Sequence, residues 1–204
     1  MSFRGTQTKQ DWHTNFQAAL IHPANTDKNL LVHSGFYNAF EILADGANGL
    51  GAKLLEIKTT TSGVPIYITG HSLGGALAQI AAAVLGDDRV AACYTFGSPR
   101  VGNSYFDLWV KVPSYRVINF ADIVPQVPLP IIYRHSGDPR YLPDPVTTSP
   151  YRYQPNFLTR SRQFAQGVVQ FIKAGGSILG IADHSIAEYS SKLDKIADVR
   201  AQSR

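Results

Sequence analysis

Residues 64–85 read VPIYITGHSLGGALAQIAAAVL, and this stretch decides the fold. Its first part, Val64–Thr69, is a short apolar run that suits a strand buried on both faces. Gly75–Leu85 is small and rich in alanine, which predicts a helix packed tightly on a sheet. Between the two, Gly70 and Gly74 allow strand and helix to approach each other without a clash of Cβ atoms. The stretch therefore predicts a strand, a sharp turn and a helix in direct succession.

The same stretch lies inside a run of 28 residues, 59–86, that contains no Asp, Glu, Lys or Arg. An uncharged run of that length raises the question of a membrane span. Glycine, proline, histidine and serine interrupt it, and no apolar segment of about 18 residues survives. We therefore predict no transmembrane segment, and we attribute the missing charges to the packing of both elements inside a sheet.

On either side of this stretch, the pattern alternates between strands and helices. Val90–Phe96 and Tyr115–Phe120 are two further candidates for buried strands. Apolar residues recur at helical spacing in Gly35–Ile57, with a possible break at residues 45–49, and again in Ser185–Val199. The alternation predicts an α/β fold with a mainly parallel central sheet flanked by helices.

The chain changes character between Pro125 and Pro155, where eight of the twelve prolines lie. We expect a long irregular excursion there, either as a wall of a binding site or as a surface loop. Phe164–Ile181, which follows, is apolar; we interpret it as a core helix, with a pocket wall as the alternative. A length of 204 residues predicts one domain covering residues 1–204.

Composition excludes several classes of protein. The single cysteine, Cys93, excludes an internal disulfide framework and a cysteine-based zinc cluster. The formal net charge is +4, but the basic residues are scattered and form no stripe interleaved with aromatic side chains, so we predict no nucleic-acid partner. Residues 1–6 show no signal peptide, which predicts a cytoplasmic protein by default, or a secreted one if the chain is an N-terminal truncation.

The turn at residues 70–74, GHSLG, matches the pattern G-x-S-x-G, in which a serine stands between a strand and a helix. Such a turn projects the Ser72 hydroxyl above the sheet, and the helix N-terminus beneath it favours the negative charge that develops in acyl transfer. The alternative is a glycine-rich turn with an idle serine. The strand before the motif and the helix after it favour Ser72 as a nucleophile.

A serine nucleophile needs a histidine base and an orienting acid, which follow it in the order Ser, Asp, His on this kind of turn. His184 stands just before the terminal helix, where packed elements can hold an imidazole accurately, whereas His135 lies in the proline-rich excursion. Asp122 follows the strand candidate 115–120, and Asp183 is too near His184 in sequence to orient its ring easily. We therefore select Asp122 and His184, with ordinary turn capping as the alternative for Asp122.

Several segments together resemble the class 3 lipases, the α/β-hydrolase family that contains fungal triacylglycerol lipases and related esterases. The segments occur in the family's order over residues 3 to 184. They are FRGT at residues 3–6, VHSGF at 32–36, ITGHSLGGALA at 68–78, TFGSPRVGN at 95–103, NFADIVP at 119–125 and DH at 183–184.

This resemblance implies an α/β-hydrolase fold with Ser72 as nucleophile, Asp122 as acid and His184 as base. It also implies that the backbone N–H groups of Thr6 and Leu73 form the oxyanion hole. No metal or organic cofactor is implied.

The resemblance further implies a lid at Gln7–Phe16, which would make transient contact with a lipid interface; a fixed helix with a core Trp12 is the alternative. Family members carry a long segment ahead of the Arg-Gly-Thr motif, whereas this chain begins three residues before Arg4. We therefore expect an N-terminally shortened version of the fold.

The expected function is that of a serine carboxylic-ester hydrolase, a lipase or esterase that cleaves acyl esters of lipids through an acyl-enzyme. Two alternatives stay open. One is an esterase acting on soluble short-chain or aryl esters, and the other is a catalytically idle relative that binds lipid.

Overall fold

The computed structural model describes residues 1–5, 19–46, 49–61, 63–86, 88–119, 121–143, 155–177 and 181–202. Five strands form the central sheet: β1 (Ser2–Phe3), β4 (Ile66–His71), β5 (Val90–Phe96), β6 (Ser114–Ile118) and β7 (Asp138–Tyr141). A separate antiparallel pair consists of β2 (Leu20–Ile21) and β3 (Val32–His33). The α-helices are α2 (Ser34–Ala44), α3 (Leu50–Thr60), α4 (Leu73–Leu85), α5 (Ser104–Trp109), α6 (Phe157–Lys173) and α7 (Ile186–Gln202). Two short 3-10 turns are η1 (Val124–Gln126) and η3 (Ala182–His184).

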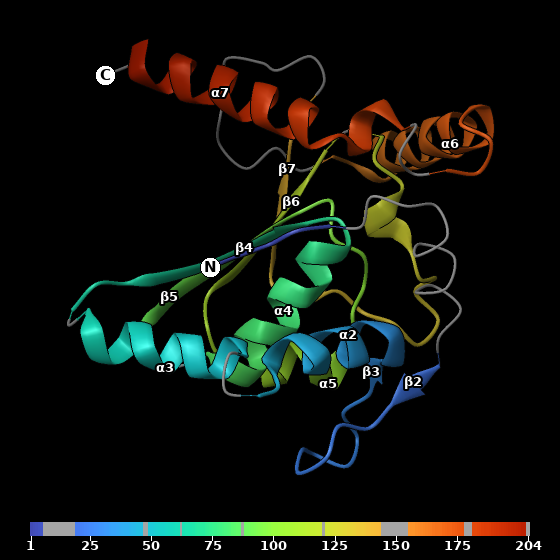
Figure 1. Cartoon of the computed structure of the whole chain (residues 1–204). Coiled ribbons are helices and arrows are strands. Elements are labelled where there is room, and N and C mark those ends of the chain that lie inside the picture. The colour runs from blue at the N-terminus through green and yellow to red at the C-terminus, as the bar shows by residue number, and fades with distance from the viewer. Residues whose placement is uncertain are drawn as a thin grey trace.

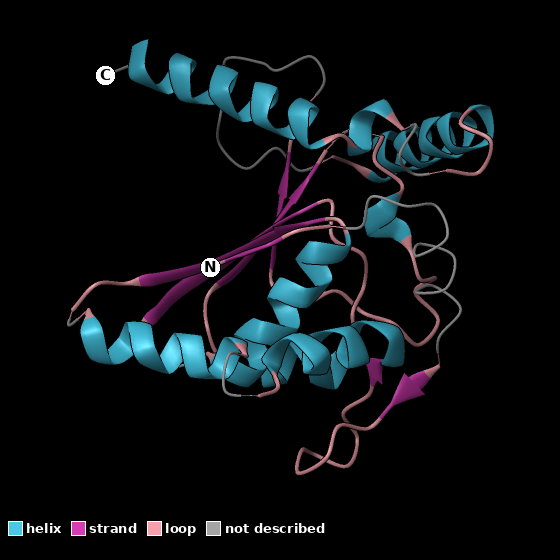
Figure 2. Cartoon of the chain, in the orientation of Figure 1, coloured by secondary structure: helices cyan, strands magenta, loops and turns pink. Residues whose placement is uncertain are grey.

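The strand order in the central sheet is β1-β4-β5-β6-β7, and every neighbouring pair is parallel. Helices α2, α3, α4 and α5 lie on one side of the sheet, and α6 and α7 lie on the other (Figures 1 and 2). This arrangement confirms the predicted α/β fold with a mainly parallel sheet flanked by helices. Because the strands are parallel, their carboxyl ends meet at one edge, where ligands bind in open α/β sheets.

The main hydrophobic core lies between the sheet and the helices α2 and α4. Ile68 of β4 and Ile80 of α4 are completely buried there, together with Phe36 of α2. Helix α2 ends at Ala44 and α3 begins at Leu50, which agrees with the break expected between them. Ten residues of α4 are buried, which agrees with the prediction of a small-residue helix packed tightly on a sheet.

The prediction that β4 is buried on both faces is wrong for the face opposite α4. Along β4, buried and more exposed side chains alternate, and the Tyr67 side chain is 51% exposed. Tyr67, Tyr94 and Tyr115 form a row of neighbouring rings on adjacent strands. β4 and β5 therefore lack charge because one face of each is core and the other carries aromatic side chains, rather than because both faces are buried.

The long irregular excursion predicted at residues 125–155 contains a strand that was not expected from the sequence. Strand β7 lies inside this stretch and pairs with β6 at the edge of the sheet. Its second residue is Pro139, which an edge strand tolerates because one side of that strand makes no ladder hydrogen bonds. The many prolines in this stretch argued against a strand, and β7 can form there because it lies at the edge of the sheet.

Candidate active site

Ser72 stands at the junction of β4 and α4 with the backbone angles φ 57° and ψ −128°. Such angles are strained for a residue with a side chain, and strain of this kind is found at functional sites. Two glycines permit the tight turn. A Cβ atom on Gly70 would lie 2.0 Å from the carbonyl oxygen of Gly74, and one on Gly74 would lie 2.3 Å from that of Phe3. The glycine spacing read from the sequence therefore has a steric cause.

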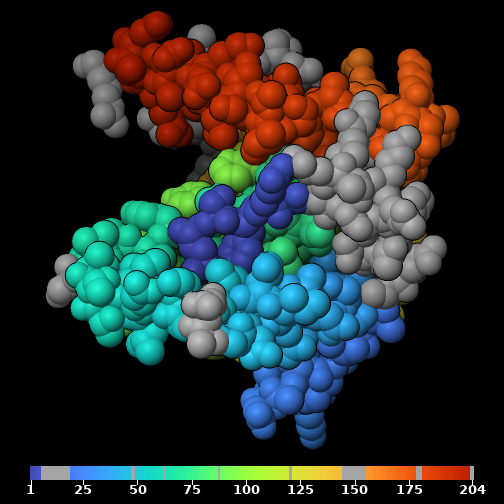
Figure 3. Space-filling view, in the orientation of Figure 1, coloured from blue at the N-terminus to red at the C-terminus, as the bar shows by residue number. Residues whose placement is uncertain are grey.

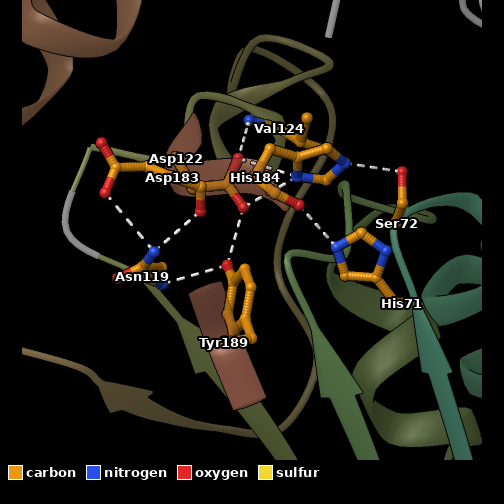
Figure 4. Close-up of polar contacts among 8 residues, drawn as sticks. All are labelled: His71, Ser72, Asn119, Asp122, Val124, Asp183, His184 and Tyr189. Atoms are coloured by element: carbon orange, nitrogen blue, oxygen red, sulfur yellow. Dashed lines mark hydrogen bonds and ion pairs between the residues drawn. The ribbon is translucent and has the colours of Figure 1, made fainter. Parts of the chain in front are cut away.

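Ser72, His184 and Asp122 form a continuous hydrogen-bonded chain (Figure 4). The Ser72 Oγ lies 2.8 Å from Nε2 of His184. On the other side of the ring, Nδ1 of His184 lies 3.0 and 2.9 Å from the two carboxylate oxygens of Asp122. A carboxylate accepts, so Nδ1 carries the proton and Nε2 is left to accept from the serine hydroxyl. All three side chains are buried.

Two further groups hold the Asp122 carboxylate. The Tyr189 hydroxyl donates to Oδ2 at 2.6 Å, and the backbone N–H of Val124 donates to Oδ1 at 2.9 Å. Complete burial, and then the nearby Asp122 charge, raise the pKa of Tyr189 well above its usual value, so the hydroxyl keeps its proton. The orientation of the carboxylate is therefore fixed from α7 and from the turn after β6.

A second layer of contacts fixes the segment that carries His184. The Asn119 side chain donates to the carbonyl oxygen of Asp183 at 2.8 Å and accepts from the buried Lys192 ammonium at 2.8 Å. The Asp183 carboxylate accepts from Gln170 of α6 at 2.7 Å. Asp183 thus ties η3 to α6, while Asp122 is the aspartate that contacts the His184 ring.

His71 packs beside His184, with ring centroids 4.7 Å apart, and its Nε2 lies 2.7 Å from the His184 carbonyl oxygen. Because a carbonyl only accepts, Nε2–H is the donor. Burial, and then the neighbouring His184, lower the pKa of His71 to about 4. His71 is therefore uncharged at neutral pH, and its hydrogen bond holds the backbone of His184 in place.

This depressed pKa predicts a loss of stability in mild acid. Between pH 6.5 and about 4 the unfolded chain binds a proton at His71 that the native chain does not, so the free energy of unfolding falls as the pH drops through this window. The expected loss is on the order of 3 kcal/mol. It can be measured by urea unfolding at pH 7 and pH 4.5 of the wild type and of His71→Gln, whose amide keeps a donor. An equal loss in both proteins would contradict the assignment to His71.

Gly97 makes room for the candidate triad, and sequence reasoning gave it no role of its own. It follows β5 with φ +57°, and a Cβ atom there would lie 2.6 Å from Oδ2 of Asp122 and 3.0 Å from Nδ1 of His184. The sequence feature that could have indicated this role is the position of Gly97 directly after a predicted strand, in a Gly-Ser-Pro turn. The sequence offered no comparable signal for Tyr189, whose helical spacing only predicted an apolar face.

A cavity of about 590 Å³ opens onto Ser72 and His184. Its apolar lining comes from two strands of the sheet and from the segment around η3: Phe3, Phe96, Ile181 and Ile186. Figure 3 shows the N-terminal residues between α7 and the helices on the other side of the sheet. The cavity is therefore built from segments distant in sequence.

Of the two candidate oxyanion-hole residues, Leu73 lies within the described part of the chain. Leu73 is the first residue of α4, where backbone N–H groups have no intrahelical acceptor. Thr6 and the predicted lid at Gln7–Phe16 lie outside the described residues. Among the residues that the structure does describe, no group of three or more His, Cys, Asp or Glu could hold a metal ion. No helix of that part of the chain is long and apolar enough to cross a bilayer.

Comparison with known proteins gives the family. A family model described as lipase (class 3) matches residues 1–131. The chain belongs to the class 3 lipase family. The secreted mono- and diacylglycerol lipase 1 of Fusarium solani is 40% identical over 147 residues, which cover 69% of this chain and 42% of that protein. The chloroplastic phospholipase A(1) DAD1 of Arabidopsis thaliana is 31% identical over 158 residues, covering 68% and 35%.

Solved structures of this family share the fold. A triacylglycerol lipase whose catalytic centre is formed by a serine protease triad superposes with a TM-score of 0.60 at 27% identity, covering 69% of this chain and 55% of that one. This class 3 lipase chain thus has the α/β-hydrolase fold, and it spans less than half the length of the two relatives above.

Proposed function

We propose that this chain hydrolyses carboxylic esters of lipids by a serine acyl-enzyme mechanism. The observation that carries the proposal is the unbroken chain of hydrogen bonds from the Ser72 hydroxyl through His184 to Asp122. Membership of the class 3 lipases supports it, as does the strained backbone of Ser72 at a strand–helix turn.

In the proposed first half-reaction, the Ser72 Oγ attacks the ester carbonyl carbon while Nε2 of His184 takes the hydroxyl proton. Asp122 keeps the imidazole in the required tautomer and stabilises the imidazolium that forms. His184 then gives the proton to the leaving alcohol, and the acyl group stays on Ser72. In the second half-reaction, His184 deprotonates a water molecule that attacks the acyl-enzyme, and Ser72 recovers its proton as the acid departs.

The proposed oxyanion hole uses the backbone N–H groups of Leu73 and Thr6. The position of Leu73 at the start of α4 supports this role, because its N–H has no hydrogen-bond acceptor within the helix. The helix dipole also favours negative charge at this end. Donors placed where charge develops are the largest single contribution in many acyl-transfer enzymes.

An acyl ester of a lipid is the proposed substrate class. The apolar part of the cavity at Ser72 is formed by Phe3, Phe96, Ile181 and Ile186, and it suits an acyl chain. Arg4 also lines the cavity and adds a cation to it. The relatives are named as lipases that act on mono- and diacylglycerol and as a phospholipase, which fits this class of substrate.

The test is a series of p-nitrophenyl esters of increasing acyl length, together with labelling by an alkyl organophosphonate. We expect turnover of the esters and a single phosphonate adduct on Ser72, seen as a mass shift of the intact protein. Absence of both turnover and labelling in the folded protein would contradict hydrolysis and would indicate an idle lipid-binding relative. Rates measured below and above substrate solubility would distinguish an enzyme activated at interfaces from an esterase acting on soluble esters.

A further inference from the structure

The residues of helix α6 that are fully buried against the protein are a glutamine and a glycine rather than apolar side chains. Gln163 and Gly167 are its buried residues. A Cβ atom on Gly167 would lie 2.5 Å from the carbonyl oxygen of Ala121, so the helix backbone rests directly on the turn that carries Asp122. One turn further on, Gln170 donates to the Asp183 carboxylate at 2.7 Å. Gln163, Gly167 and Gln170 therefore form most of the inner side of this helix, and Phe171 packs beside them against Val124 and Ile181. A surface helix normally places apolar side chains along this whole side.

The opposite side of α6 is apolar and exposed to solvent. We call this surface the apolar face of α6; it consists of Leu158, Val169 and Ile172, with exposed fractions of 76%, 49% and 68%. Phe157 and Phe164, which are 81% and 45% exposed, lie at one border of this face, where they line a cavity that also reaches Asp122. At 3.6 residues per turn, Ile172 projects directly opposite Gln163. In Figure 1 the helix lies at the outer margin of the molecule, beside α7.

The charges of α6 all have one sign. The helix contains Arg160, Arg162 and Lys173 and no acidic residue. Arg162 and Lys173 are both exposed, and they are eleven residues apart, which is about three turns, so they line one border of the apolar face. Apolar side chains bordered by cations, on a helix of low overall hydrophobicity, are typical of helices that lie in the surface of a membrane.

We propose that α6 is a docking helix for an anionic lipid surface. The apolar face of α6 enters the boundary between headgroups and acyl chains, while Arg162 and Lys173 lie against lipid phosphates. Positive charge without any acidic residue selects an anionic surface over a neutral one. Docking requires no ester hydrolysis, so this inference is independent of the proposed function. Because α6 contacts the turn of Asp122 and the Asp183 carboxylate, it would hold the Ser72 site close to the lipid.

The test is co-sedimentation with vesicles, using the chain with Ser72→Ala so that no lipid is consumed. One vesicle preparation contains phosphatidylcholine alone, and the other contains equal parts of phosphatidylcholine and phosphatidylglycerol. We expect binding to the anionic vesicles, weakened by salt. Adding Leu158→Gln with Ile172→Gln is expected to lower the partition coefficient about 10-fold or more.

The matched control for these apolar substitutions is Ile42→Gln with Leu55→Gln. Those side chains are 79% and 63% exposed on α2 and α3, on the other side of the sheet, and their replacement is expected to leave partitioning unchanged. All four side chains are largely exposed, so thermal unfolding midpoints should stay close to the wild-type value.

The charges are tested separately by Arg162→Gln with Lys173→Gln, compared with Lys28→Gln with Lys195→Gln. The first pair is expected to weaken binding to anionic vesicles about 5-fold for each charge removed, with little change on phosphatidylcholine alone. The second pair removes the same net charge elsewhere and is expected to have a much smaller effect.

Two results in the vesicle assay would overturn the proposal: no binding of the parent chain to anionic vesicles, or an equal loss of vesicle binding in the test pairs and in their control pairs. A third would be self-association of the chain that Leu158→Gln with Ile172→Gln abolishes while vesicle binding persists. The last result, detected by sedimentation velocity, would assign the apolar face of α6 to contact with a second copy of the chain. Hydrolysis of a soluble ester by the chain with intact Ser72 reports on the proposed function separately.

Discussion

Replacement of Ser72 by alanine is expected to lower kcat/KM for acyl esters by on the order of 10⁴-fold or more, because it removes the atom that attacks the carbonyl. The residual rate would come from substrate binding and the oxyanion hole. The measurement is hydrolysis of a p-nitrophenyl ester under conditions in which the wild type turns over. Far-UV circular dichroism should show that the fold is retained.

Ser190→Ala provides the matched control, since Ser190 is an exposed serine on α7. Its activity should equal that of the wild type, and an organophosphonate should label it fully, whereas Ser72→Ala should stay unlabelled. Unchanged turnover by Ser72→Ala would remove Ser72 from the proposed mechanism.

Replacement of Asp122 by asparagine is expected to lower kcat by about 10⁴-fold while the fold survives. The carboxylate now accepts from Nδ1–H of His184, which leaves Nε2 free to accept the serine proton. An amide can turn its NH₂ group toward Nδ1 and favour the other tautomer, in which Nε2 carries the proton and cannot act as a base. Steady-state kinetics with a soluble ester measure the effect.

Tyr189→Phe is a milder change at the same carboxylate. It removes one hydrogen bond to Asp122 and keeps the negative charge of Asp122. We expect a fall in kcat of about 10-fold, the size of a hydrogen bond to a charged group, with KM nearly unchanged. If Asp122→Asn were no more damaging than Tyr189→Phe, Asp122 would contribute packing rather than the orientation of His184.

The sequence by itself determined the local parts of this fold. The strand β4, the turn at Ser72 and the helix α4 were predicted from adjacent residues, because glycine spacing and apolar runs act over a few positions. The parallel sheet followed from the alternation of strands and helices. Asp122 and His184 are candidates from sequence because each stands at the end of a predicted element, where packed neighbours can hold a side chain in place.

Only the tertiary structure decided which distant groups meet. Tyr189 and Asp122 are 67 positions apart, and nothing in a helix with apolar spacing shows that one of its side chains will hold a carboxylate. Strand β7 exists because a sheet edge tolerates Pro139, and the edge is a property of the assembled sheet. The burial of Gln163 and Gly167 on α6, in place of its apolar side chains Leu158 and Ile172, has the same origin. Hydrophobic pattern predicts a helix, but which of its sides meets the protein depends on what the rest of the chain presents to it.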